Sequence, residues 1–353
     1  MTDAPVRRRD PVLLKVALVA FGILAALVTV EIAARIQSGD WTGSFLERSV
    51  PLVPTGYPMS YDALLGWIPR PGYSGDNNHW HRQVTISADG LRANGSESPH
   101  GQRPILAVGD SFTFGDEVAD GETWPAQLEH ILWRPVLNAG VSGYGLDQAV
   151  LRARKLAATV QPEWVIVSFI PEDITRCELR VFGAAKPYFI LEGGELRPGN
   201  QPVPPPQPVT QDALHQVLGH SFVVHTVMSK VARTYWASGR AHSVGVHSDG
   251  EAVATHLLRA LADELAARHI RLLVVVQAAQ DLDPGKRALA ARVLASLNGT
   301  EAVTLDLHSP LQELRERDPE RFKRLYRRHM TLDGNAFVAD RIAAAIRHAG
   351  NAG

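Results

Sequence analysis

The sequence predicts an α/β fold with a central parallel sheet, preceded by one N-terminal transmembrane helix. Two observations carry this prediction. From residue 103 onward, short apolar segments alternate with longer segments of helical periodicity, and this alternation is typical of a parallel sheet covered by helices on both faces. Near the N-terminus, residues 12–34 form an apolar stretch whose only charged residues are Lys15 and Glu31.

The apolar stretch 12–34 is long enough to cross a bilayer, because a helix of this length spans about 30 Å. Three arginines at 7–9 precede it, Lys15 can extend toward them, and Glu31 falls near the opposite interface. The positive-inside rule therefore predicts a single-pass protein of the inner (cytoplasmic) membrane, with residues 1–11 cytoplasmic and the rest exported. A cleaved signal peptide and a buried core helix are the alternatives. The stretch has neither a clear small-x-small cleavage site nor a polar stripe.

Residues 35–102 are predicted to form an extracytoplasmic collar. This region is rich in glycine, proline and turn residues, with scattered aromatic side chains. Residues 51–72 are expected to be extended and loop-like, and residues 84–92 to form a short hairpin that turns at Asp-Gly. The aromatic content favours a collar docked on the next domain over a flexible tether.

The predicted α/β domain covers residues 103–350. The predicted strands are 105–108, 135–138, 164–169, 271–276 and 302–307. The predicted helices are 124–133, 146–160, 252–268, 286–296 and 334–348. This order predicts a flavodoxin-like three-layer sandwich, in which sites form at the carboxyl ends of the strands.

Residues 177–250 interrupt the alternation and are predicted to be an insertion. Within it, residues 187–196 suggest a hairpin, residues 201–208 a polyproline II connector and residues 213–237 a helix. An insertion on the site-bearing edge is a natural place for a lid or substrate shelf. A solvated loop with a stiff spacer is the alternative.

Composition excludes several classes of function. A net charge of −1 gives no reason to expect a nucleic acid partner. The single cysteine, Cys177, rules out an intrachain disulfide and a cysteine-based zinc cluster, and we expect it to be inert. The glycines after the first strand lack the spacing of a dinucleotide or P-loop cradle, which argues against a flavin or nucleotide protein. No metal or cofactor is predicted.

Polar residues follow the predicted strands at one edge of the sheet. The first strand runs into Gly109-Asp110-Ser111, where a serine after a tight turn is placed as a nucleophile. The second strand ends in the glycine-rich segment 138–145, which lets a backbone N–H approach an oxyanion. The third strand ends in Pro171-Glu172-Asp173, and His329 lies shortly before the last helix.

Together these segments resemble the SGNH/GDSL hydrolase superfamily over about residues 60–350, and residues 62–72 and 86–92 are similar to the leader of its bacterial membrane-anchored members. The resemblance implies that Ser111 is the nucleophile and that its N–H is one oxyanion donor. It implies that Gly143 supplies the second donor and that His329 is the base, with no metal in the site. The residues expected to support the site are Asp110, Glu172 and Asp173.

The resemblance implies a serine esterase or O-acyltransferase that works through an acyl-serine. The expected partner is a small-molecule or glycan ester, including acylated envelope or exported polysaccharide. Arg176 is a candidate contact for an acidic glycan. The alternative is a catalytically inactive glycan-binding or assembly scaffold in the membrane.

Two positions depart from the family pattern. Where the family has an oxyanion asparagine, this chain has Glu172, so the carboxyl is expected either to be neutral and donate its O–H or to point away while Asp173 shapes the turn. Where the family has the acid that orients the histidine, this chain has Tyr326 and Arg327. The predicted substitutes are a backbone carbonyl, which would leave a Ser-His dyad, or one of the acids Asp306, Asp318 and Asp333.

Overall fold

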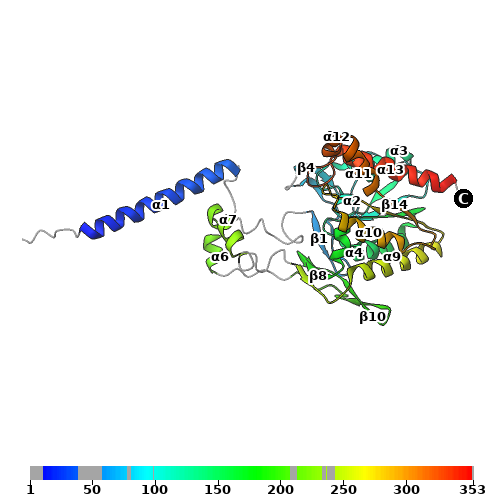
Figure 1. The fold of residues 1–353 in the computed structure, drawn as a ribbon, viewed down its shortest axis with the longest axis horizontal. Helices are drawn as coiled ribbons and strands as arrows, with labels where there is room; N and C mark the ends of the chain where they lie inside the picture. The colour runs from blue at the N-terminus through cyan, green and yellow to red at the C-terminus, as the bar shows by residue number, and fades with distance from the viewer. Residues whose placement is uncertain are drawn as a thin grey trace, which may run out of the picture. The chain divides into compact units, whose positions relative to one another are not determined.

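The chain is described by a computed structural model that covers residues 11–38, 58–77, 81–97, 99–206, 213–232, 236 and 243–351 (Figure 1). The described residues fall into two compact units. One unit contains the apolar helix α1 (Pro11–Ser38) with α6 (Ala213–Leu218) and α7 (Phe222–Val231). The other contains the sheet and all remaining elements.

A five-stranded sheet forms the centre of the larger unit. Its strands are β5 (Ile105–Gly109), β6 (Val136–Asn138), β7 (Trp164–Phe169), β13 (Arg271–Val276) and β14 (Val303–Asp306). All neighbouring strands pair in parallel, in the order β14-β13-β7-β5-β6. Counted along the chain from the β6 edge, this order is 2-1-3-4-5, that of a flavodoxin-like sheet. The turn after β5 therefore lies at the point where the strand order reverses.

Side chains alternate between two apolar layers because successive strand residues face opposite ways. Ile105 and Ala107 belong to the layer that packs on α3, α11, α12 and α13, whereas Leu106 and Val108 belong to the layer on α4, α9 and α10. Helices therefore cover both faces of the sheet, as predicted (Figure 1). The bounds are α3 (Trp124–Leu132), α4 (Leu146–Val160), α9 (Gly250–Ala266), α10 (Pro284–Ala295), α11 (His308–Arg317), α12 (Pro319–Arg324) and α13 (Leu332–Asn351).

The collar residues are more ordered than predicted. Residues expected to be loop-like contain the antiparallel pair β1 (Met59–Asp62) and β2 (Gly66–Pro69), and β3 (Ser74–Asn77) pairs with β4 (Arg82–Thr85). The bridge between Ile86 and Arg92 confirms the turn at Asp-Gly. A third apolar cluster explains this order, because collar side chains pack with residues of the serine turn and the glycine-rich segment in the same unit; its members are Met59, Leu65, Trp67, Val84, Ile86, Phe114, Val141 and Tyr144.

The predicted insertion contains several short elements. The hairpin is confirmed as β10 (Tyr188–Glu192) paired with β11 (Glu195–Gly199), and β8 (Leu179–Phe182) lies between β9 (Ala184–Ala185) and β12 (Ser243–Gly245). The single helix predicted over 213–237 is wrong. The chain breaks between α6 and α7 because Ser221 caps α7 with its hydroxyl. The ends of the 201–208 connector and of the 213–237 segment lie outside the described residues.

Candidate active site

The serine turn follows β5 directly. Ser111 begins the short helix α2 (Ser111–Phe114), and the Asp110 carboxylate accepts a hydrogen bond of 2.9 Å from the Phe112 N–H. Gly115 ends this helix in the left-handed conformation, at φ +86°. The sharp turn fixes Ser111 at the carboxyl end of a central strand, with 7% of the residue exposed.

His329 contacts Ser111 and a carboxylate at the same time. The His329 Nε2 atom lies 3.0 Å from Ser111 Oγ, and its Nδ1 atom lies 3.1 Å from Glu117 Oε1. The arrangement fits an imidazole that carries its proton on Nδ1, donates it to Glu117 and leaves Nε2 free to accept the serine hydroxyl proton. The ring also packs on Phe112, with 5.2 Å between the ring centroids. The structure thus brings the predicted serine and histidine together.

Glu117 is the site residue that the sequence analysis missed. Its carboxylate accepts the backbone N–H of His329 at 2.9 Å and that of Arg328 at 3.2 Å, in addition to the imidazole. Its side chain is only 2% exposed. A buried carboxylate with these donors is held rigidly, and it in turn holds the histidine turn in place. The signal in the sequence is an acid that follows the helix begun by Ser111, whereas the family pattern places the acid just before the histidine.

The predicted substitutes for the orienting acid make other contacts. Asp306 accepts from His308 Nδ1 at 3.1 Å, and Asp318 caps α12 by accepting from the Arg321 N–H at 2.9 Å. Asp333 lies in the first turn of α13. The carboxylate found at His329 Nδ1 is that of Glu117, so the expectation that a backbone carbonyl or one of Asp306, Asp318 and Asp333 takes this place is wrong.

The glycine-rich segment after β6 packs directly on the serine turn. A Cβ atom at Gly140 would lie 2.3 Å from the Phe114 nitrogen, so only glycine allows this approach. Gly143 adopts the left-handed conformation, at φ +79°. The preceding Ser142 donates its hydroxyl proton to Asp116. Asp116 and Glu117 are adjacent, so this acidic pair connects the serine turn to both the glycine-rich segment and the histidine turn.

A collar residue holds the segment that carries Glu117. Arg92 is 2% exposed, and its guanidinium donates to the carbonyls of Phe114 and Val118 at 2.6 Å each and to that of Gly115. Its Cζ also lies 4.9 Å from the centroid of the Phe114 ring. Arg92 therefore binds the backbone on both sides of Glu117, a role that is not evident from the sequence.

Glu172 points toward a lysine. Its Oε1 lies 2.7 Å from Lys286 Nζ, and Lys286 also pairs with Asp281 at 2.9 Å. The two carboxylates raise the pKa of Lys286. One oxygen of Glu172 is thus paired with a cation, whereas the other, Oε2, is buried and has no hydrogen-bond partner among the described residues.

Asp110 and Asp173 form a buried acidic pair next to Arg176. Asp173 accepts from the Ile170 N–H at 3.1 Å and from Arg176, and Arg176 lies 3.8 Å from Asp110. Burial raises the pKa of both aspartates, and for Asp173 the neighbouring Asp110 charge adds to the effect. Arg176, the candidate glycan contact, makes these internal contacts. Burial also raises the pKa of the Cys177 thiol, consistent with an inert cysteine.

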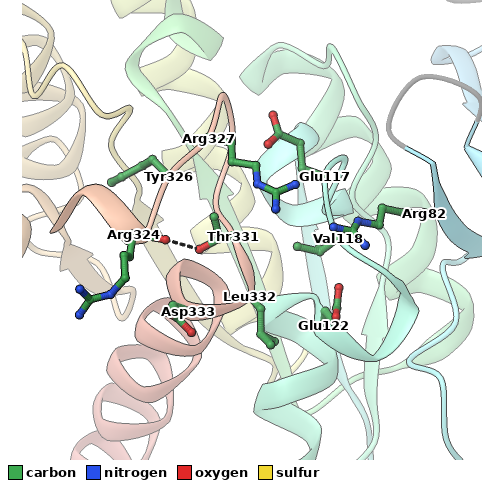
Figure 2. A pocket seen from close by; sticks show the side chains of 10 residues that line it. All are labelled: Arg82, Glu117, Val118, Glu122, Arg324, Tyr326, Arg327, Thr331, Leu332 and Asp333. Atoms are coloured by element: carbon green, nitrogen blue, oxygen red, sulfur yellow. Dashed lines mark hydrogen bonds between the residues drawn. The ribbon is translucent and has the colours of Figure 1, made fainter. Parts of the chain in front are cut away.

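A cavity of about 420 Å³ lies beside the histidine turn and shares Glu117 as part of its wall (Figure 2). Three arginines and three acids line it, so its charges balance; they are Arg82, Arg324, Arg327, Glu117, Glu122 and Asp333. Thr331, which also lines the cavity, donates its hydroxyl proton to the Arg324 carbonyl at 2.7 Å. Among the described residues, no group of three His, Cys, Asp or Glu side chains is arranged to hold a metal ion.

No family model and no curated protein matches this chain. Among solved structures, it is similar to TesA, with 15% identity and a TM-score of 0.42 over 70% of this chain and 99% of that one. It is similar to a catalytic mutant of the acetylxylan esterase from Geobacillus stearothermophilus, with 13% identity and a TM-score of 0.41 over 70% and 95%. It is also similar to a GDSL-like lipase from Bacteroides thetaiotaomicron, with 12% identity and a TM-score of 0.39 over 72% and 94%.

These neighbours are of the kind that the sequence resemblance predicted.

Proposed function

We propose that this protein is a serine esterase that works through Ser111, His329 and Glu117. The observation that carries the proposal is the unbroken chain of contacts from Ser111 Oγ to His329 Nε2 at 3.0 Å and from His329 Nδ1 to Glu117 at 3.1 Å. A hydroxyl, an imidazole and a buried carboxylate in this order are the parts needed to activate an alcohol as a nucleophile.

In the proposed reaction, His329 Nε2 takes the Ser111 hydroxyl proton while Oγ attacks the ester carbonyl carbon. The oxyanion that forms is stabilised by the N–H groups of Ser111 and Gly143. Glu117 stabilises the imidazolium and fixes its tautomer. The tetrahedral intermediate then expels the alcohol, which takes the proton from His329, and leaves an acyl-serine. Water attacks this ester in the second half of the reaction, again with His329 as base, and releases the acid.

Transfer of the acyl group to another alcohol uses the same acyl-serine, so an O-acyltransferase shares every step up to deacylation. We propose ester-bearing glycans of the envelope, or exported polysaccharide, as the substrate class, because α1 is apolar enough to anchor the chain at a membrane. The alternative of an inactive scaffold depended in part on the lack of an acid at the expected position before His329. The Glu117 carboxylate at His329 Nδ1 argues against this alternative.

The decisive test is covalent labelling of the full chain by a fluorophosphonate, which reacts with activated serines. We expect one phosphonyl adduct, located on Ser111 by peptide mass spectrometry. The adduct should be absent in Ser111→Ala and form about 10⁶-fold more slowly in His329→Ala, the scale found when the histidine of a triad is lost. A wild-type chain that stays unlabelled while its thermal unfolding remains cooperative would overturn the proposal.

A further inference from the structure

Helix α7 begins on a carboxylate that α1 supplies. Glu31 accepts hydrogen bonds from the Ser221 hydroxyl at 2.8 Å and from the N–H groups of Phe222 at 2.8 Å and Val223 at 3.0 Å. The first N–H groups of a helix have no partner within the helix, and the positive end of the helix dipole attracts an anion. Glu31 therefore caps α7 from another helix, far away in the sequence.

Arg35 completes this junction. Its Nε donates to Glu31 at 2.7 Å, and its NH2 group donates to the carbonyl of His220. The side chains of Arg35 and Glu31 are 17% and 21% exposed, although the rest of α1 exposes its apolar residues widely. A charged side chain in an apolar helix is costly unless it is paired. The pairing of Glu31 with Arg35 and with the start of α7 therefore indicates a specific contact between α1 and α7.

The helices next to this junction expose apolar side chains. Leu214 and Val227 are 49% and 50% exposed, and Val217 and Val231 are 72% and 80% exposed. They belong to the same compact unit as α1. The most apolar part of α1, within the span Leu14–Ile36, has no buried residues. Exposed apolar side chains in the same unit as a helix able to span a bilayer are suited to contact with lipid.

We propose that α6 and α7 form a second membrane-contacting element that docks on the end of α1 through Glu31, with the bilayer covering the exposed leucine and valines. In this arrangement α1 stays part of the mature chain, because removing it as a signal peptide would remove the cap of α7. The part of the insertion that contains α6 and α7 is thus assigned to the anchor, whereas a lid or substrate shelf was one expectation for the insertion as a whole. The proposal rests on the membrane location of α1 and not on the esterase chemistry.

The test places a fluorescent NBD probe on Val217→Cys or Val231→Cys in the full chain, reconstituted in phosphatidylcholine–phosphatidylglycerol vesicles. We expect blue-shifted emission that is quenched by doxyl-labelled lipid and protected from iodide. Quenching by iodide would overturn the lipid assignment. Protection from both quenchers would also overturn it, since it would mean that protein covers the probe. The unmodified chain, whose single cysteine Cys177 is buried, controls for stray labelling.

The role of Glu31 is tested by adding Glu31→Ala to the Val231 probe. We expect the probe to become accessible to iodide, and Glu31→Gln to restore part of the protection because it keeps one acceptor oxygen. Thr29→Ala is the matched control, since Thr29 donates only to the carbonyl of Ala25 in its own helix. Unchanged protection in Glu31→Ala would overturn the docking.

Retention of α1 is read from the mass of the chain extracted from membranes. A chain that begins after residue 36 would overturn the whole inference. Fluorophosphonate labelling of the same sample separates the two proposals, because labelling of Ser111 in a processed chain would leave the esterase proposal standing.

Discussion

Two turns at the same edge of the sheet differ in how they use adjacent acids. After β5, the pair Asp116–Glu117 is buried and binds the glycine-rich segment and the histidine turn. After β7, Glu172 is 32% exposed and pairs with Lys286. Both turns offer a glutamate near the candidate site, but only one meets the imidazole. Burial and the partner set the role of an acid, and its position at a strand end does not.

The comparison is tested most strongly by Glu117→Gln. Loss of the orienting carboxylate should lower kcat toward p-nitrophenyl acetate by about 10³–10⁴-fold, as expected when the histidine tautomer is no longer fixed. Asp306→Asn is the matched control, because Asp306 holds His308 with the same 3.1 Å contact, and it should leave kcat nearly unchanged. A fall of less than about tenfold in Glu117→Gln would remove Glu117 from the triad.

Arg92→Lys tests whether the hydrogen bonds from Arg92 to the backbone around Glu117 hold this acid in place. Three buried carbonyls would share fewer donors, so we expect the free energy of unfolding to fall by about 1–3 kcal/mol. We expect kcat to fall by about 10–100-fold with little change in KM, because Glu117 would be less well positioned. Steady-state kinetics and urea unfolding measure the two effects.

Arg152→Lys is the comparison variant for Arg92→Lys. Arg152 is also buried and also donates to two carbonyls, those of Ala139 and Gly90. If Arg152→Lys lowers kcat as much as Arg92→Lys does, at the same loss of stability, then Arg92 has no specific role in positioning Glu117.

The buried pair Asp110 and Asp173 predicts that the stability of the folded chain depends on pH. Burial and the Asp110 charge raise the pKa of Asp173, so the folded chain binds a proton that the unfolded chain has already lost. Stability should therefore fall as the pH rises from the ordinary aspartate pKa, about 3.9, through the raised folded value. In Asp173→Asn this fall should be smaller.

Urea unfolding between acidic and neutral pH measures the slope. Asp340→Asn, at an exposed position in α13, is the control that should keep the wild-type slope. If Asp173→Asn shows the same pH dependence of stability as the wild-type chain, Asp173 does not titrate between acidic and neutral pH.

The smallest effect is expected for Glu172→Asn, which restores the residue type of the family pattern. Its ion pair with Lys286 is partly exposed, so stability should change by about 0–1 kcal/mol. Because the side chain is directed toward Lys286, the new amide should not raise kcat. An increase of tenfold or more, about 1.4 kcal/mol in the barrier, would show that this position does reach the oxyanion.

The sequence by itself determined the five strands of the parallel sheet, five of the helices that cover it and two of the three residues of the proposed triad. The apolar runs that became β7 and β13 and the periodicity that became α4 reflect local side-chain patterns, which a linear reading detects. Ser111 and His329 were found because each lies at a characteristic place in the order of elements.

Only the tertiary structure decided which acid serves the histidine. Glu117 and His329 are 212 residues apart, and nothing local distinguishes Glu117 from Asp306 or Glu172. The direction of Glu172 depended in the same way on Lys286, and the place of α7 depended on Glu31. The physical reason is common to all three: a carboxylate takes its role from the donors that folding brings to it, and these donors come from distant parts of the chain.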